Sequence, residues 1–88
     1  MREASMKAKE WSVELYITED GPDTVAHAVL LSGGQKRTTA RGRARRNPAD
    51  REVPEIGDEL AVSRALTILA DRLHDVASRD IAELAGPV

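Results

Sequence analysis

Basic side chains are concentrated in one short stretch of this chain. The segment RTTARGRARR, residues 37–46, is followed at once by the acidic segment NPADREVPEIGDE. Residues 36–51 hold seven Lys and Arg side chains and one Asp, a charge of +6; because the whole chain has a net charge of −2, the remainder carries −8. Arginines at alternate positions of a strand lie about 7 Å apart, close to the phosphate spacing of a nucleic-acid strand. The pattern predicts phosphate binding by Lys36, Arg37, Arg41, Arg43, Arg45 and Arg46.

Two other interpretations of these arginines stay open. Arginines on a strand are often solvated, or paired with a Glu on a neighbouring strand, for which Glu14 is a candidate. They also suit an acidic protein surface, such as that of a second copy, because the rest of the chain is strongly negative.

Side chains that could perform catalysis do not form a recognisable pattern. His27 and His74 fall on different predicted elements without a metal-ligand spacing, and the chain has no Cys to complete a site. The serines have no nucleophile-elbow context, and Gly33 and Gly34 fit a turn and not a phosphate-binding loop. The sequence predicts a non-enzyme without a metal, a cofactor or a small-molecule substrate.

Length and composition limit the class of protein. Eighty-eight residues with no Phe and a single Trp make one small domain whose core consists of Leu, Ile, Val and Ala. Such a core leaves a thin stability margin, which favours a homodimer. The absence of Cys, of an apolar N-terminal segment and of a membrane-spanning window predicts a cytoplasmic protein. We expect a flexible N-terminus over residues 1–9 and one domain over residues 10–86.

Alternating polarity predicts two strands in the first third of the chain. In EWSVELYIT, residues 10–18, one face carries Trp11, Val13, Leu15 and Ile17. After the turn EDGPD, the run TVAHAVLLS has two possible inward faces. We favour Ala26, Ala28 and Leu30 inward, because small residues allow a helix to approach closely. This choice leaves Val25, His27 and Val29 outward as a candidate dimer interface.

A third strand and a helix complete the expected fold. In KRTTARGRAR, alternation places Thr38, Ala40, Gly42 and Ala44 inward and Arg37, Thr39, Arg41, Arg43 and Arg45 outward. Asn47 and Pro48 favour one short helical turn. The long helix then runs from Glu55 to a stop at Gly86 and Pro87, with Leu69 facing the sheet, Thr67 facing solvent and either a kink or a separate short last helix near Ser78. Its apolar stripe comprises Val62, Leu66, Leu69, Leu73 and Val76. The fold class is α+β: a three-stranded antiparallel sheet packed against a long C-terminal helix.

This order of elements, with GRARRNPADREVPEIGDELAVSRAL joining the last two, resembles a family of small actinobacterial proteins of unknown function associated with stress and dormancy. That family is similar in fold to the double-stranded-RNA-binding domain (dsRBD) and to ribosome hibernation-promoting factors. The resemblance implies a dsRBD-like fold and a stress-associated protein that binds the ribosome or RNA.

The chain departs from double-stranded-RNA binders at two places. No N-terminal helix is apparent, and the long helix opens with Glu55, Asp58 and Glu59, which repel phosphate where those domains have lysines. Electrostatic contact with RNA through the arginine strand is therefore the first hypothesis. The alternative is a protein-interaction module or homodimer with no nucleic-acid role.

Overall fold

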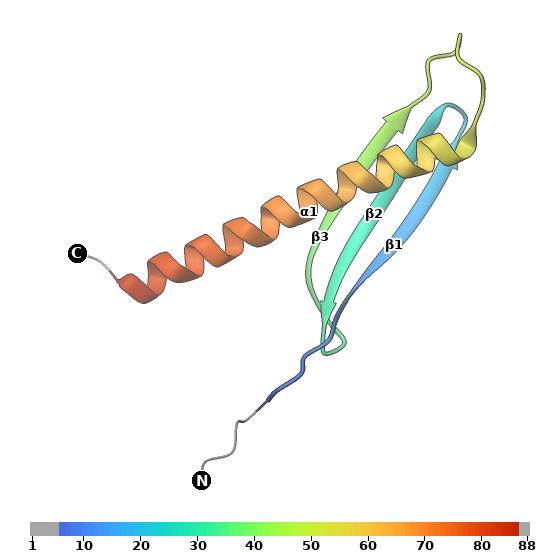
Figure 1. Ribbon diagram of the computed structural model, residues 1–88. Coiled ribbons are helices and arrows are strands. Elements are labelled where there is room, and N and C mark those ends of the chain that lie inside the picture. Colours follow the sequence, from blue (N-terminus) through green and yellow to red (C-terminus); the bar gives the residue numbers. More distant parts are fainter. Residues whose placement is uncertain (1–5, 87–88) are drawn as a thin grey trace.

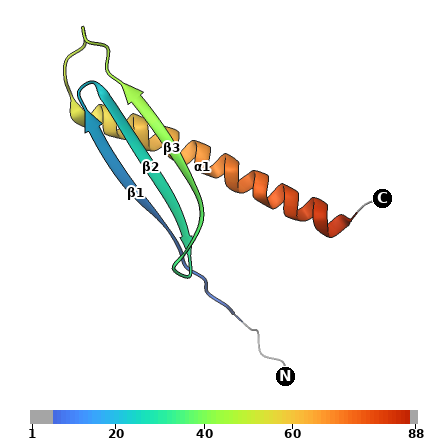
Figure 2. The ribbon, with the colours of Figure 1, turned by 180° about the vertical axis from the view of Figure 1, so that it is seen from behind.

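The computed structural model describes residues 6–86. It contains strands β1 (Trp11–Asp20), β2 (Asp23–Ser32) and β3 (Gln35–Arg45), followed by one helix, α1 (Pro54–Ala85). The strands form an antiparallel sheet in the order β1-β2-β3, and α1 crosses one face of it (Figure 1). Seen from the other side, the sheet lies in front of the helix (Figure 2). The expected α+β fold is confirmed; residues 6–10 belong to no strand or helix, and the first part of the expected flexible N-terminus lies outside the described residues.

Tight turns determine the pairing of the strands. Gly33 and Gly34 both have positive φ values, 58° and 77°, as the two central residues of a type I′ hairpin turn require. A β-bulge follows, because the register of β2 with β3 shifts between Leu30 and Leu31. Every residue of β3 after the bulge pairs in phase with β2, as far as Arg45 opposite Asp23.

Small side chains form most of the core between sheet and helix. The choice of inward face for β2 is confirmed, since Ala26, Ala28 and Leu30 are buried. A Cβ on Gly42 of β3 would overlap the main-chain atoms of Ala61 and Ala65, so the helix lies directly on the strand backbone there. This close approach seats α1 over β2 and β3. The buried core cluster comprises Ala26, Ala28, Leu30, Ala40, Ala44, Ala61, Ala65 and Leu69.

The apolar stripe of the helix differs from the expected one. Leu69 is buried and Thr67 exposed, as predicted, and Val62 and Leu73 pack partly against the core. Leu66 and Val76 are exposed, whereas Ala61 and Ala65 face the sheet. Side-chain size is therefore a poor guide to burial on this helix. Alanine occupies the positions of closest approach to the sheet, and the larger residues beside those positions lie outside the contact.

One local prediction is wrong, and another is confirmed. Helix α1 continues through Ser78 without a break, and the Ser78 hydroxyl donates to the His74 carbonyl, so the apparent phase shift reflects the loss of sheet contact and not a kink. The short turn expected at Asn47 and Pro48 is present: the Asn47 side-chain oxygen accepts from the Ala49 N–H, as an N-cap does, and its carbonyl accepts from the Asp50 N–H. The helix ends at Gly86 as expected; Pro87 lies outside the described residues.

Candidate nucleic-acid interface

Three of the predicted arginines lie together on the sheet face opposite the helix, which we call the free face. Their cross-strand partners are His27 for Arg41, Val25 for Arg43 and Asp23 for Arg45. All three are exposed and occupy alternate positions of one regular strand. The expected alternation is therefore present in the second half of β3. Arg41, Arg43 and Arg45 form a ladder in which successive arginine positions are about 7 Å apart along the strand.

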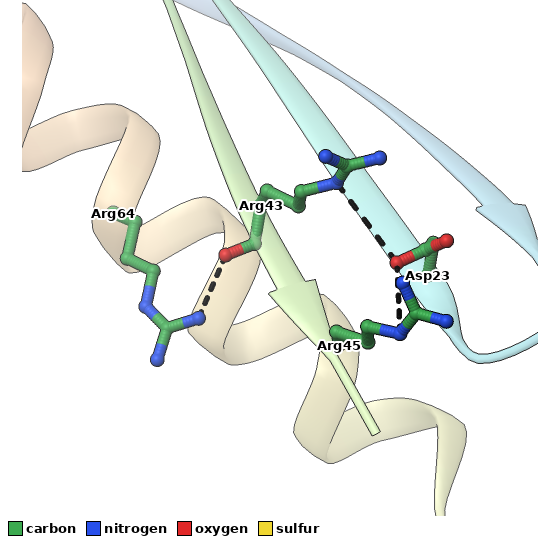
Figure 3. A network of polar contacts seen from close by, with 4 residues as sticks. All are labelled: Asp23, Arg43, Arg45 and Arg64. Carbon is green, nitrogen blue, oxygen red and sulfur yellow. Dashed lines mark hydrogen bonds and ion pairs between the residues drawn. The ribbon is translucent and has the colours of Figure 1, made fainter. Parts of the chain in front are cut away.

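One carboxylate lies between the last two arginines of the ladder. The Nε atoms of Arg43 and Arg45 are both 3.9 Å from Asp23 Oδ1 (Figure 3). This distance permits electrostatic attraction but is too long for a hydrogen bond, and Asp23 Oδ1 has no hydrogen-bond donor in the described part of the chain. The two arginine side chains are 70% and 69% exposed, so the pairing is weak and leaves their N–H groups accessible.

Sequence reasoning chose the wrong acid for these arginines. Glu14 lies on β1, which β2 separates from β3, and its carboxylate accepts a hydrogen bond of 2.8 Å from the Tyr16 hydroxyl. That hydrogen bond and the charge of Glu14 raise the pKa of Tyr16. Asp23 is adjacent to the ladder because β2 and β3 are antiparallel, so the first residue of β2 lies opposite the last residue of β3.

Two arginines of the helix, which the sequence analysis did not include, extend the positive surface around the outer edge of β3. Arg64 Nη1 donates to the main-chain carbonyl of Arg43 at 2.7 Å (Figure 3), and Arg72 Nη1 donates to that of Thr39 at 2.5 Å. Eight residues of helix span about 12 Å and four residues of strand about 13 Å, so the two spacings match. The spacing of eight residues between Arg64 and Arg72, which places both on one flank of a helix, is the sequence pattern that could have predicted these contacts.

Three of the predicted basic residues do not join the ladder in the expected way. The bulge turns Arg37 to the helix side of the sheet, where its guanidinium lies 5.5 Å from the Trp11 ring centre and within 3.4 Å of the Ser32 hydroxyl. Its assignment to the arginine face is wrong because the extra residue breaks the alternation. Lys36 is exposed beyond the bulge, and Arg46 is half-buried with Nη1 bonded to the Asp50 carbonyl.

The outward patch of β2 lies on the free face as expected. Val25 and His27 are half-buried, but Val29 is only 6% exposed, so its neighbours in the sheet already cover it. The Tyr16 ring lies 6.5 Å from the His27 ring at 48°, and Arg41 is the next residue across the sheet. The free face thus changes from acidic and aromatic at β1 to basic at β3.

An acidic contact joins the end of β1 to the start of the helix. Asp58 Oδ1 is buried, and the Glu19 carboxyl lies beside the Asp58 carboxyl. A hydrogen bond between the two carboxyl groups needs a proton on one of them, and this bond, together with repulsion from Asp58, raises the pKa of Glu19. The contact keeps negative charge on the helix side of the sheet, away from the ladder.

The other potential sites give weaker evidence of binding or catalysis. Within residues 6–86 no three His, Cys, Asp or Glu side chains are arranged to hold a metal ion, and His27 and His74 lie on the sheet and on the far half of the helix. A hollow of about 320 Å³ lies between the β1–β2 turn and the loop before α1. Its rim carries Glu19 and Glu52 as well as Arg46 and Arg51, so charges of both signs meet there. The described part of the chain has no helix long and apolar enough to cross a membrane.

Comparison with known proteins identifies the family. The family model described as Rv2632c-like matches residues 9–87. The chain is 47% identical to Uncharacterized protein Mb1767 of Mycobacterium bovis over 73 residues, 83% of this chain and 77% of the relative. It is 38% identical to Uncharacterized protein Rv2632c of Mycobacterium tuberculosis over 81 residues, 92% of this chain and 86% of the relative.

A solved structure supports the same assignment. The crystal structure of Rv2632c superposes with a TM-score of 0.85 at 35% sequence identity, covering 97% of this chain and 100% of the other. The relatives are named as uncharacterized proteins, so no activity comes from their names. Similarity over nearly the whole chain, in sequence and in fold, makes this protein a member of the Rv2632c-like family, a small actinobacterial family of unknown function.

Proposed function

We propose that this protein is a non-enzymatic, stress-associated factor that binds RNA, including the RNA of the ribosome, through phosphate contacts along β3. The observation that carries the proposal is the arginine ladder of Arg41, Arg43 and Arg45 on an uncovered sheet face. Arg64 and Arg72 continue the positive charge around the strand edge. The stress association comes from the family resemblance of the sequence.

The ladder suits a phosphate backbone better than a base-reading site. Its arginines are presented at regular spacing from a rigid strand, and the one acid beside them, Asp23, is held at 3.9 Å without a hydrogen bond. Tyr16 is exposed on the same face but lies on β1, two strands away from the ladder. Stacking of successive bases on aromatic side chains is therefore not expected. Binding is expected to be electrostatic, independent of sequence and sensitive to salt.

The test replaces the ladder while preserving the fold. Arg41, Arg43 and Arg45 are changed together to Gln, and binding to single-stranded RNA and to purified ribosomes is measured across a salt series. Loss of three phosphate contacts should reduce the slope of log affinity against log salt by roughly 2 to 3. The melting temperature should change little because the three side chains are exposed.

A charge-matched control removes three positive charges elsewhere. Lys7, Arg51 and Arg79 lie off the ladder, and their joint change to Gln lowers the net charge equally. If both triple variants lose affinity alike, the effect is one of net charge and the ladder is not the site. If neither variant changes RNA or ribosome binding but the ladder variant alone alters self-association, the arginines bind protein instead.

A further inference from the structure

The helix-facing side of β1 is an apolar surface without a cover. Trp11, Val13, Leu15 and Ile17 are 40–47% exposed. Ala26 and Ala28, the neighbours of Ile17 and Leu15 across the sheet on β2, are fully buried under the helix. The cover therefore stops between β2 and β1, and the apolar side chains of β1 lie outside it.

One flank of α1 borders this uncovered strand. Ala65 faces the sheet, and Arg64 reaches toward the outer edge of β3. Successive helix residues are about 100° apart, so Leu66 lies on the opposite flank, toward β1. Leu66 is 39% exposed, although it is a large apolar residue beside the core. The exposed apolar face of β1 and this flank of the helix together make one uncovered apolar surface, which we call the groove.

The last twelve residues of the helix lie beyond the sheet. Figure 2 shows it continuing past β3, on the side away from β1, and every residue from His74 to Ala85 is exposed. These twelve residues span about 18 Å, and a helix of that length is marginal in water without packing. Val76, Ile81 and Leu84 are exposed and lie outside the core cluster, and Leu84 is 89% exposed. We call this segment, residues 74–85, the projecting half-helix.

The surface area of the chain exceeds that of a compact monomer. A protein of 9.6 kDa is expected to expose about 5,100 Å², whereas this chain exposes 7410 Å². Its radius of gyration is 18.5 Å, against about 12 Å for a compact domain of this length. Residues 6–10, which are exposed and belong to no strand or helix, contribute part of the excess. The excess of about 2,300 Å² is larger than the roughly 800 Å² per partner that a stable interface buries.

We propose that a second copy of this chain covers the groove, with the projecting half-helix of each copy lying in the groove of the other. One chain carries both halves of the contact, which is the condition for a two-fold symmetric, reciprocal dimer. The charges also match: Lys9 and Arg37 lie at the Trp11 end of the groove. The half-helix carries Asp75, Asp80 and Glu83 against a single Arg79. This interface uses the helix side of the sheet and is independent of the arginine ladder and of RNA.

The first experiment measures mass by light scattering and sedimentation equilibrium from low to high micromolar concentration. The wild-type chain should have twice the monomer mass of 9.6 kDa. Leu15→Arg places a charge in the groove and should raise the dimer Kd at least about 30-fold, the effect of losing a central interface residue. Tyr16→Arg adds the same charge on the opposite face of the same strand and should leave the Kd unchanged.

A second variant tests the half-helix independently of the groove. Ile81 and Leu84, changed together to Arg, should also raise the Kd about 30-fold without altering circular dichroism, because neither residue belongs to the core of its own chain. An equimolar mixture of this variant with the Leu15→Arg variant should form heterodimers, since one groove and one half-helix remain intact and compatible.

Three results would overturn the proposal. A wild-type mass of 9.6 kDa at every concentration means that no second copy covers the groove. Dissociation by Tyr16→Arg but not by Leu15→Arg places the dimer on the free face, which includes Val25, His27 and Val29. Dissociation by Leu15→Arg alone, with the half-helix variant still dimeric, indicates pairing of β1 with β1 and not reciprocal insertion.

Discussion

The two edge strands of the sheet have opposite environments. On β3 the helix lies directly above Gly42, and Arg64 and Arg72 bond to the outward main-chain carbonyls of the strand. On β1 every residue is exposed, although its helix-side face carries larger apolar side chains than that of β3. The strand with the more hydrophobic inward face is thus the one without a cover.

The difference shows that side-chain size and not hydrophobicity positions the helix. A helix packs closely only where neither surface carries bulky groups, and Ala40, Gly42 and Ala44 on β3 meet Ala61 and Ala65 on α1. The tryptophan, leucine and isoleucine of β1 would hold the helix away. Close packing on β2 and β3 therefore leaves β1 open, and a strand edge left open in this way favours association.

The largest effect is expected from comparing two leucines on the helix. Leu69 is 5% exposed above β2 and β3, and Leu69→Ala should reduce the free energy of unfolding by about 2–5 kcal/mol. Leu66→Ala, on the flank toward β1, should cost far less when measured on dilute, monomeric protein. Thr67→Ala serves as a solvent-exposed control. Chemical denaturation of the three variants checks the order; equal losses for Leu69→Ala and Leu66→Ala would show that the helix covers both strands alike.

A smaller effect is expected at the point of closest approach. The added methyl group of Gly42→Ala would overlap main-chain atoms of Ala61 and Ala65, so the helix must shift, and overpacking of this kind costs about 1–3 kcal/mol. Arg41→Ala, at the adjacent exposed position of the same strand, should leave the melting temperature nearly unchanged. The melting temperatures of both variants, measured by thermal unfolding, test this prediction. A Gly42→Ala protein as stable as the wild type would contradict the seating of the helix on β3.

The smallest effect concerns the acidic contact where β1 meets the helix. Because the pKa of Glu19 is raised in the folded state, the folded chain binds this proton more tightly than the unfolded chain does. Stability should therefore rise as the pH falls from above this raised pKa toward the ordinary value of 4.5, and should decrease as the pH rises through the same range. Glu19→Gln should reduce this pH dependence and raise the melting temperature slightly at neutral pH.

The control for the acidic contact is Glu59→Gln, which removes an exposed carboxylate from the same end of the helix. Melting temperatures of the wild type and both variants across the pH range provide the measurement. If Glu59→Gln reduces the pH dependence as much as Glu19→Gln does, the effect comes from the general negative charge of the helix start and not from the Glu19–Asp58 contact.

Much of the candidate site follows from local sequence. Alternation alone places Arg41, Arg43 and Arg45 on one face, because a regular strand turns successive side chains to opposite sides. The same rule fails for Arg37, where one extra residue at the bulge reverses the direction of the side chain. The bulge arises from pairing with β2, and no pattern within β3 reveals it.

The sequence by itself determined the three strands, the two turns, the two ends of the helix and the inward faces of β2 and the second half of β3, because these depend on residues close together in the chain. Only the tertiary structure decided which strands the helix covers, which acid lies beside the arginine ladder and which helix arginines bond to β3. These features join residues about 20 or more positions apart, such as Arg43 with Asp23 and Arg72 with Thr39. Their geometry depends on how closely the helix approaches the sheet. The side-chain volumes on the two surfaces together determine that distance.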